Sequence, residues 1–146
     1  MIVYLDASAL VKRYVVETGS EDVGDLIDRA DAVGTTILSR VEVTAALAKG
    51  ARMKLLSRQR AAVALRVFYS EWDDIVRLQM TDVLVSRAST LAWEHDLRGY
   101  DAAHLASALF WQDMLGESVA VATYDRQLWE AAEATGLVAW PRELPA

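Results

Sequence analysis

The stretch IVYLDASALVKRY, residues 2–14, joins a short apolar run to an acid that follows it directly. Residues 2–5, IVYL, predict a short buried strand. Residues 8–17 carry apolar side chains at helical spacing and predict a helix. Asp6 therefore stands where a buried strand ends, and in open α/β sheets ligands bind outside the carboxyl ends of the strands.

The rest of the chain alternates in the same way between strand and helix patterns. Further strands are expected at residues 32–37, 75–79, 118–123 and 137–140. Further helices are expected at residues 20–30, 39–53, 57–72, 81–96, 100–115 and 124–135. This alternation predicts one α/β domain over residues 1–146, with a central parallel sheet of four to five short strands flanked by helices.

Composition narrows the class of protein. The chain has 146 residues, an ordinary length for one domain, and contains no Cys. The absence of Cys excludes disulfides, Cys-ligated zinc and a Cys nucleophile, and it fits a reducing compartment. No segment reaches the roughly 18 apolar residues of a membrane span, and the N-terminal segment lacks the basic start of a signal peptide. We therefore expect a cytoplasmic protein with no membrane association.

The net charge of −6 argues against nucleic acid as a partner, because phosphate contacts need positive charge. Two facts weaken this argument. Carboxylates that bind Mg²⁺ or Mn²⁺ are neutralised in the working protein. The basic residues are also uneven, since residues 49–60, KGARMKLLSRQR, carry five Lys or Arg and no acid. That run is interpreted as an RNA-facing edge, a contact for a partner protein, or a solvated connection between helices.

Four acids stand at positions that suit a shared site. Asp6 and Asp125 follow apolar strands, and Glu42 and Asp101 lie in apolar surroundings near the starts of helices. Carboxylates and water are the ligands that suit Mg²⁺ and Mn²⁺, and phosphodiester cleavage by two metal ions needs several carboxylates directed at one place. Like charges are tolerated together only when a cation offsets them. Jointly, the acids favour metal-dependent cleavage of phosphodiesters.

Each acid also has a purely structural interpretation. Asp6 and Asp125 could cap the helices that follow them. Glu42 could close a capping box with Ser39, which is the expected N-cap of helix 39–53. Asp101 could simply stabilise the positive end of its helix dipole. Taken one at a time, the structural interpretation is favoured for Glu42 and Asp101, so the functional case depends on the four acids together.

Other polar residues near the acids are weaker candidates. His104 follows Asp101 by one helical turn and could be a metal ligand or a general base, but a packed His in apolar company is the favoured interpretation. Basic side chains close to the acids in sequence could contact phosphate, and solvated charges or salt bridges explain them equally well. These substrate-binding candidates are Lys12, Arg13, Arg40, Arg98 and Arg126.

Four stretches of the chain together resemble one family. They are YLDASALVKRY (4–14), SRVEVTAAL (39–47), LRGYDAAHLASAL (97–109) and VATYDRQL (121–128). In order and spacing they are similar to PIN-domain ribonucleases, in particular the VapC-type toxins of prokaryotic toxin–antitoxin systems. The resemblance implies a PIN-like α/β domain with a central parallel sheet, and RNA cleavage that depends on Mg²⁺ or Mn²⁺.

The resemblance also assigns roles to the acids. It places four residues on the acidic catalytic site of the family: Asp6, Glu42, Asp101 and Asp125. Asp6 and Asp101 are the first expected metal ligands, and Glu42 is expected to act directly or through a water. Members of the family differ at the position of Asp125 in whether an acid ligates the metal.

Two polar residues and three partners complete what the resemblance implies. Ser8 and Thr123 fall beside the acidic site, where they would hydrogen-bond carboxylates or waters. The implied partners are an RNA substrate, a cognate antitoxin that lays a segment over the cleft, and a second copy of the chain in a homodimer.

Three rival functions remain to be weighed. An aspartate-nucleophile phosphatase could use Asp6, but that chemistry usually has a second acid two residues later, where this chain has Ser8. A non-catalytic module that binds protein or RNA could keep the fold, although the four intact acids argue mildly against it. A receiver-type signalling domain lacks the paired acids after its first strand.

Overall fold

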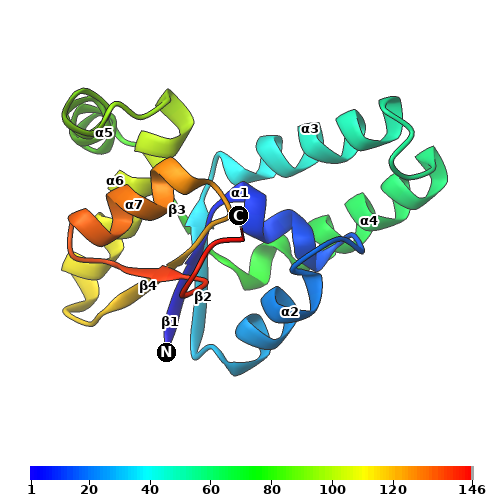
Figure 1. The fold of residues 1–146 in the computed structure, drawn as a ribbon, viewed down its shortest axis with the longest axis horizontal. Helices are drawn as coiled ribbons and strands as arrows, with labels where there is room; N and C mark the ends of the chain where they lie inside the picture. Colours follow the sequence, from blue (N-terminus) through cyan, green and yellow to red (C-terminus); the bar gives the residue numbers. More distant parts are fainter. Residues whose placement is uncertain (146) are drawn as a thin grey trace.

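The computed structural model describes residues 1–145, and five parallel strands form one sheet at its centre (Figure 1). The strands are β1 (Ile2–Leu5), β2 (Ala32–Thr36), β3 (Val76–Leu78), β4 (Val119–Ala122) and β5 (Val138–Trp140). Their order across the sheet is β3-β2-β1-β4-β5, and every neighbouring pair is parallel. The predicted central parallel sheet is confirmed. Its strand order reverses between β1 and β4, which makes the carboxyl ends of these two strands the expected place for a site.

Helices cover both faces of the sheet (Figure 1). Within residues 1–145 they are α1 (Ala7–Leu10), α2 (Ser20–Arg29), α3 (Ser39–Arg52), α4 (Arg58–Glu71), α5 (Asp82–His95), α6 (Gly99–Leu115) and α7 (Arg126–Ala134), with short 3-10 helices η1 (Val11–Arg13) and η2 (Trp72–Asp74). Helices α5, α6 and α7 lie on one side of the sheet and α1 to α4 on the other, where α3 and α4 extend outward as a hairpin. None of the helices in the described part of the chain has the length and apolar character to cross a membrane.

Strand β1 supplies side chains to both halves of the core. Ile2 and Tyr4 pack with the α5–α7 side, whereas Val3 and Leu5 pack with the α1–α4 side. Successive side chains of a strand point to opposite faces, so a strand covered on both faces must be apolar at every position. This explains why IVYL is an unbroken apolar run and why the first polar residue after it, Asp6, marks the edge of the core.

The helix predicted over residues 8–17 is wrong at its end, because helical structure stops at Arg13. A local hydrogen-bonding alternative replaces the last turn. Ser20 Oγ donates to the carbonyl of Val15 and accepts from the backbone N–H of Glu17. A Ser side chain that pairs with nearby backbone groups competes with helix in this way.

We predict that Gly34→Ala destabilises the protein by about 1–3 kcal/mol through overpacking. A Cβ atom at Gly34 would lie 2.6 Å from Cζ3 of Trp111, and the Trp111 ring on α6 is only 4% exposed. The matched control is Gly24→Ala on α2, where a Cβ meets nothing within 4 Å. That control should stabilise the helix by roughly 0.5–1 kcal/mol. Urea unfolding of both variants measures the difference, and equal stabilities would contradict the close packing of α6 on β2.

Candidate active site

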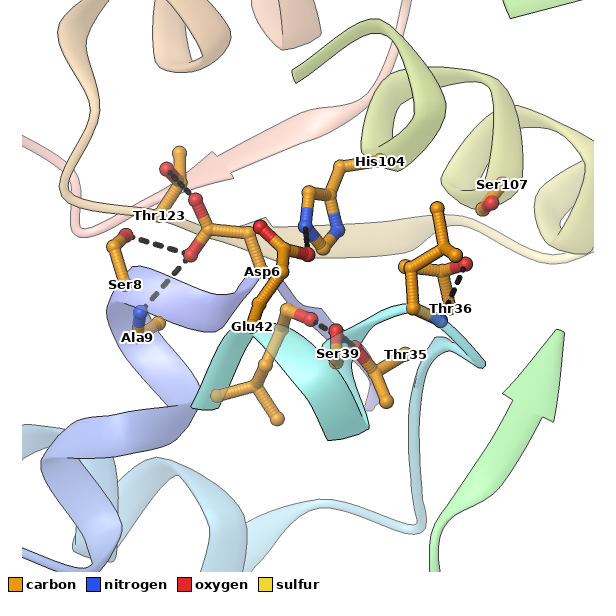
Figure 2. Close-up of polar contacts among 12 residues, drawn as sticks. Asp6, Ser8, Ala9, Thr35, Thr36, Ser39, Glu42, His104, Ser107 and Thr123 are labelled. Carbon is orange, nitrogen blue, oxygen red and sulfur yellow. Dashed lines mark hydrogen bonds and ion pairs between the residues drawn. The ribbon is translucent and has the colours of Figure 1, made fainter. Parts of the chain in front are cut away.

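Asp6 is a buried carboxylate at the end of β1, with a side chain held on both oxygens (Figure 2). Oδ1 accepts from Ser8 Oγ at 2.7 Å and from the backbone N–H of Ala9 at 2.9 Å. Oδ2 accepts from Thr123 Oγ1, just beyond β4. Asp6 therefore does cap α1, but it also joins the ends of the two strands at which the sheet order reverses.

Glu42 does not take the capping role that the sequence favoured for it. Leu38 occupies the N-cap position of α3, and Ser39 is the first helical residue. The Ser39 hydroxyl instead pairs with Thr35 Oγ1 at 2.6 Å, inside the core. The prediction of a capping box between Ser39 and Glu42 is thus wrong, because the Ser39 hydroxyl has a buried partner on β2. Glu42 Oε1 lies 2.8 Å from Nε2 of His104.

His104 is packed, as its apolar surroundings indicated, with 2% of its surface exposed. Its Nδ1 lies 2.8 Å from the Tyr4 hydroxyl, whose oxygen accepts from the backbone N–H of Thr36. Because that oxygen already has a donor, the Tyr4 proton is free for Nδ1, which leaves Nε2–H to donate to Glu42. The sequence missed this link between Tyr4 and Glu42; its only signal was the position of the His one turn after Asp101.

Asp101 and Asp125 are brought together by one guanidinium group. Asp101 lies in the first turn of α6, and Asp125 is the N-cap of α7, where its Oδ1 accepts from the backbone N–H of Leu128. Arg98 Nε donates to Asp101 Oδ2 at 2.9 Å, and Arg98 Nη2 donates to Asp125 Oδ2. Two of the four predicted acids therefore share a cation supplied by the protein.

Burial dominates the pKa values of the acids at the site. Burial raises the pKa of Asp6, and burial also raises the pKa of Asp101, with Asp125 adding to the effect and Arg98 opposing it. Burial lowers the pKa of His104, but the hydrogen bond to Glu42 and the charges of Asp6, Glu42 and Asp101 outweigh it, so the net pKa is raised. His104 thus lies within electrostatic reach of three of the acids.

The donor chemistry of the site fits a hard divalent cation. Carboxylate oxygens are the ligands that Mg²⁺ and Mn²⁺ prefer, and added positive charge would relieve the repulsion among the acids. Over residues 1–145, no hydrogen bond reaches Glu42 Oε2 or Asp101 Oδ1, which leaves these oxygens for a ligand. The side chains nevertheless lie as pairs, since no three His, Asp or Glu residues of the described chain are grouped to hold an ion.

The other basic candidates differ in what they contact. Arg13 pairs with Glu71 at 3.1 Å, at the end of α4. Arg40 lies over the ring of Tyr69, also on α4, at 4.0 Å from its centroid. Both therefore have structural partners on that helix, and solvated or paired charge explains them without a ligand.

Two further candidates lie next to the segment that follows β4. Lys12 pairs with Glu17 and lies over the ring of Tyr124 at 4.4 Å. Arg126 is exposed at the start of α7 and forms no salt bridge with any described residue. Three basic candidates therefore lie near Asp125. Arg98 forms a salt bridge with it, Lys12 contacts the neighbouring Tyr124, and Arg126 follows it in the sequence.

Comparison with known proteins identifies the family. The PIN domain model matches residues 3–134, so the chain belongs to the PIN domain family. The chain is 40% identical over 143 residues to Ribonuclease VapC45 of Mycobacterium tuberculosis, which spans 98% of this chain and 97% of that protein. It is 32% identical over 130 residues to Ribonuclease VapC3 of Pyrobaculum aerophilum, spanning 89% and 94% of the two chains. The resemblance noted from the four motifs is confirmed.

Solved structures share the fold at lower identity. The crystal structure of PAE2754 from Pyrobaculum aerophilum has a TM-score of 0.66 at 22% identity, covering 95% of this chain and 83% of the other. A toxin–antitoxin complex from Klebsiella pneumoniae has a TM-score of 0.67 at 14% identity, covering 93% and 95%. At these identities the likeness establishes the arrangement of helices and strands.

We predict that Tyr4→Phe destabilises the protein by about 1–3 kcal/mol, because it leaves the Thr36 N–H and His104 Nδ1 without a partner in the core. The control is Tyr124→Phe, whose hydroxyl forms no hydrogen bond with residues 1–145. That control should change stability by less than about 0.5 kcal/mol. Chemical denaturation measures both; a Tyr4→Phe variant as stable as the control would contradict the hydrogen-bonded chain from Tyr4 to Glu42.

Proposed function

We propose that this chain is a metal-dependent endoribonuclease that hydrolyses RNA phosphodiester bonds, that it is the toxin of a toxin–antitoxin pair, and that residues 1–146 act as one nuclease domain. The observation that supports this most is the arrangement of acids where the strand order reverses: Thr123 Oγ1 joins Asp6 to the backbone of Asp125, and Arg98 bridges Asp125 to Asp101. Two relatives from Mycobacterium tuberculosis that are each 40% identical to this chain carry the name ribonuclease, which gives the same reaction class.

Three of the acids are the proposed holders of Mg²⁺ or Mn²⁺: Asp6 and Asp101 directly, and Glu42 directly or through a water. When bound, a divalent cation supplies the charge that activates a water nucleophile and stabilises the leaving oxygen. Ser8 and Thr123 fix the orientation of Asp6 by hydrogen bonds. Asp125 is the acid that we expect to bind least directly, because members of the resembled family differ in whether an acid at this position ligates the metal.

His104 orients Glu42 by holding Oε1, and no hydrogen bond from residues 1–145 reaches Oε2. In this mechanism no protein side chain attacks the phosphorus. Hydrolysis by water would leave a 5′-phosphate on the product. The phosphatase alternative is disfavoured, because Ser8 stands where that chemistry usually has a second acid.

The antitoxin has a suitable place to bind. A groove of about 1250 Å³ lies between η1 and the hairpin of α3 and α4, and most of the basic run at residues 49–60 borders it. Apolar side chains such as Val15, Leu47 and Val63 line the groove beside Arg13 and Lys49. A segment with apolar and acidic side chains would complement it. The homodimer and the cytoplasmic location follow from the proposed activity and the family resemblance.

The activity is tested by incubating antitoxin-free protein with total cellular RNA in Mg²⁺, in Mn²⁺ and in excess EDTA, and mapping the product ends. We predict cuts bearing 5′-phosphates in either metal and none in EDTA. The double variant Asp6→Asn/Asp101→Asn should lose activity by about 100-fold or more. Replacing a residue that only hydrogen-bonds a metal ligand already lowers metal affinity or activity by about 10–100-fold. Glu130→Gln, an exposed acid on α7, is the control and should cut like wild type.

Two results would contradict this function. Cleavage that persists in EDTA and in the double variant would mean that the acids do not catalyse it. A folded protein that neither cuts RNA nor binds a divalent ion would leave the non-catalytic binding module as the better description.

A further inference from the structure

Arg98 has an unusual position among the cations of the structure. Among the basic side chains of residues 1–145, that of Arg98 alone forms salt bridges with two carboxylates, those of Asp101 and Asp125. It is the N-cap residue of α6, three residues before Asp101, and its side chain remains 70% exposed. A guanidinium group that is mostly in water therefore bridges two acids of the candidate catalytic site.

The oxygens that Arg98 occupies are ones that a metal ion would need. Asp125 Oδ1 caps α7, so the bridge to Arg98 engages its remaining oxygen, Oδ2. On Asp101 the guanidinium takes Oδ2 and leaves Oδ1. A divalent cation drawn to the same carboxylates would meet a like charge at hydrogen-bond distance from its ligand atoms, and the repulsion between like charges at such separations is strong.

We propose that Arg98 is a built-in counter-cation that competes with the catalytic metal, holding Asp101 and Asp125 in the metal-free protein and turning outward when the metal binds. This inference rests on the proposed metal-dependent function. It agrees with the position of Arg98, which holds Asp101 and Asp125 on one guanidinium group.

The exposure of Arg98 makes the exchange feasible. Exposed ion pairs contribute little net stability, so the bridge can open when a better cation arrives. Once released, the guanidinium stands at the rim of the site with its fork of donors in solvent. That fork matches the oxygens of a phosphate, so the same residue becomes a contact for the RNA backbone beside the cleaved bond.

The test is the affinity of antitoxin-free protein for Mn²⁺, measured by calorimetry on wild type, Arg98→Gln and Arg126→Gln. Arg98→Gln should bind Mn²⁺ about three- to tenfold more tightly than wild type, because a competing cation is gone. Arg126→Gln removes the same charge from a neighbouring exposed position that has no salt bridge with described residues, and it should change the affinity less than twofold.

Two further measurements separate competition from a structural role. In EDTA the melting temperature of Arg98→Gln should fall below that of wild type, and saturating Mn²⁺ should remove the difference. With saturating Mn²⁺, Arg98→Gln should raise the KM for RNA. A merely structural residue would weaken metal binding and RNA binding together, whereas the proposal requires opposite signs.

The outcomes are distinct. Equal or weaker Mn²⁺ binding by Arg98→Gln, with wild type binding the ion, would overturn the proposal and leave the nuclease function intact. Equal tightening by Arg126→Gln would also overturn it, since the effect would then be general electrostatics. If wild type and both variants bind no Mn²⁺, the metal-dependent function fails and this inference fails with it.

Discussion

Asp6 is a buried carboxyl group at the carboxyl end of the central strand, and hydrogen bonds from its surroundings hold both of its oxygens in place. Burial of a carboxylate is unfavourable unless donors and opposite charges surround it. Three donors come from two segments that follow β1 and β4. The Ser8 hydroxyl also accepts from the backbone N–H of Tyr124, and the Thr123 hydroxyl accepts from that of Asp125. The segment after β1 is therefore bonded to the segment after β4 as well as to Asp6.

Charge balance links this carboxylate to the rest of the site. Within the described residues, Asp101 and Asp125 pair with the exposed guanidinium group of Arg98, and Glu42 pairs with the buried imidazole of His104. A site with more acids than counter-charges should attract cations, which fits the proposed divalent ion. Two of the acids that contribute to the net charge of −6, Asp6 and Asp101, are buried and are not surface charges.

Local sequence patterns predicted the sheet and its helices well, because they depend on neighbours in the chain. The unbroken apolar run at residues 2–5 and the alternation of strands with helices were sufficient for a parallel sheet. The predicted end of the helix at residues 8–17 was wrong, because the chain after Arg13 is shaped by hydrogen bonds of Ser20, which lies beyond the predicted helix. The prediction that Ser39 caps its helix was wrong, because the sequence did not indicate that Ser39 would pair with the buried Thr35.

The sequence singled out the four candidate acids as a prediction, but it could not show which side chains they pair with. The pairing of His104 with Glu42 spans 62 positions, and that of Arg98 with Asp125 spans 27. Neither spacing is a local pattern, and each needs the sheet order before it can be inferred. The role of Arg98 in particular required seeing that α6 and α7 begin beside each other at the carboxyl end of β4.

The proposed site depends on the buried carboxylate of Asp6, and the stability of Asp6→Asn in EDTA tests most directly whether the cost of burying it exceeds the gain from the three hydrogen bonds that hold it. Burial raises the folded pKa of Asp6 above its unfolded value, so wild type gains stability as pH falls through the folded pKa. We predict that Asp6→Asn is more stable than wild type at pH 7, that this advantage shrinks on acidification, and that Mn²⁺ stabilises only wild type. Glu130→Gln should show none of these effects. A variant that is less stable than wild type at pH 7 in EDTA, with a deficit independent of pH, would contradict the account.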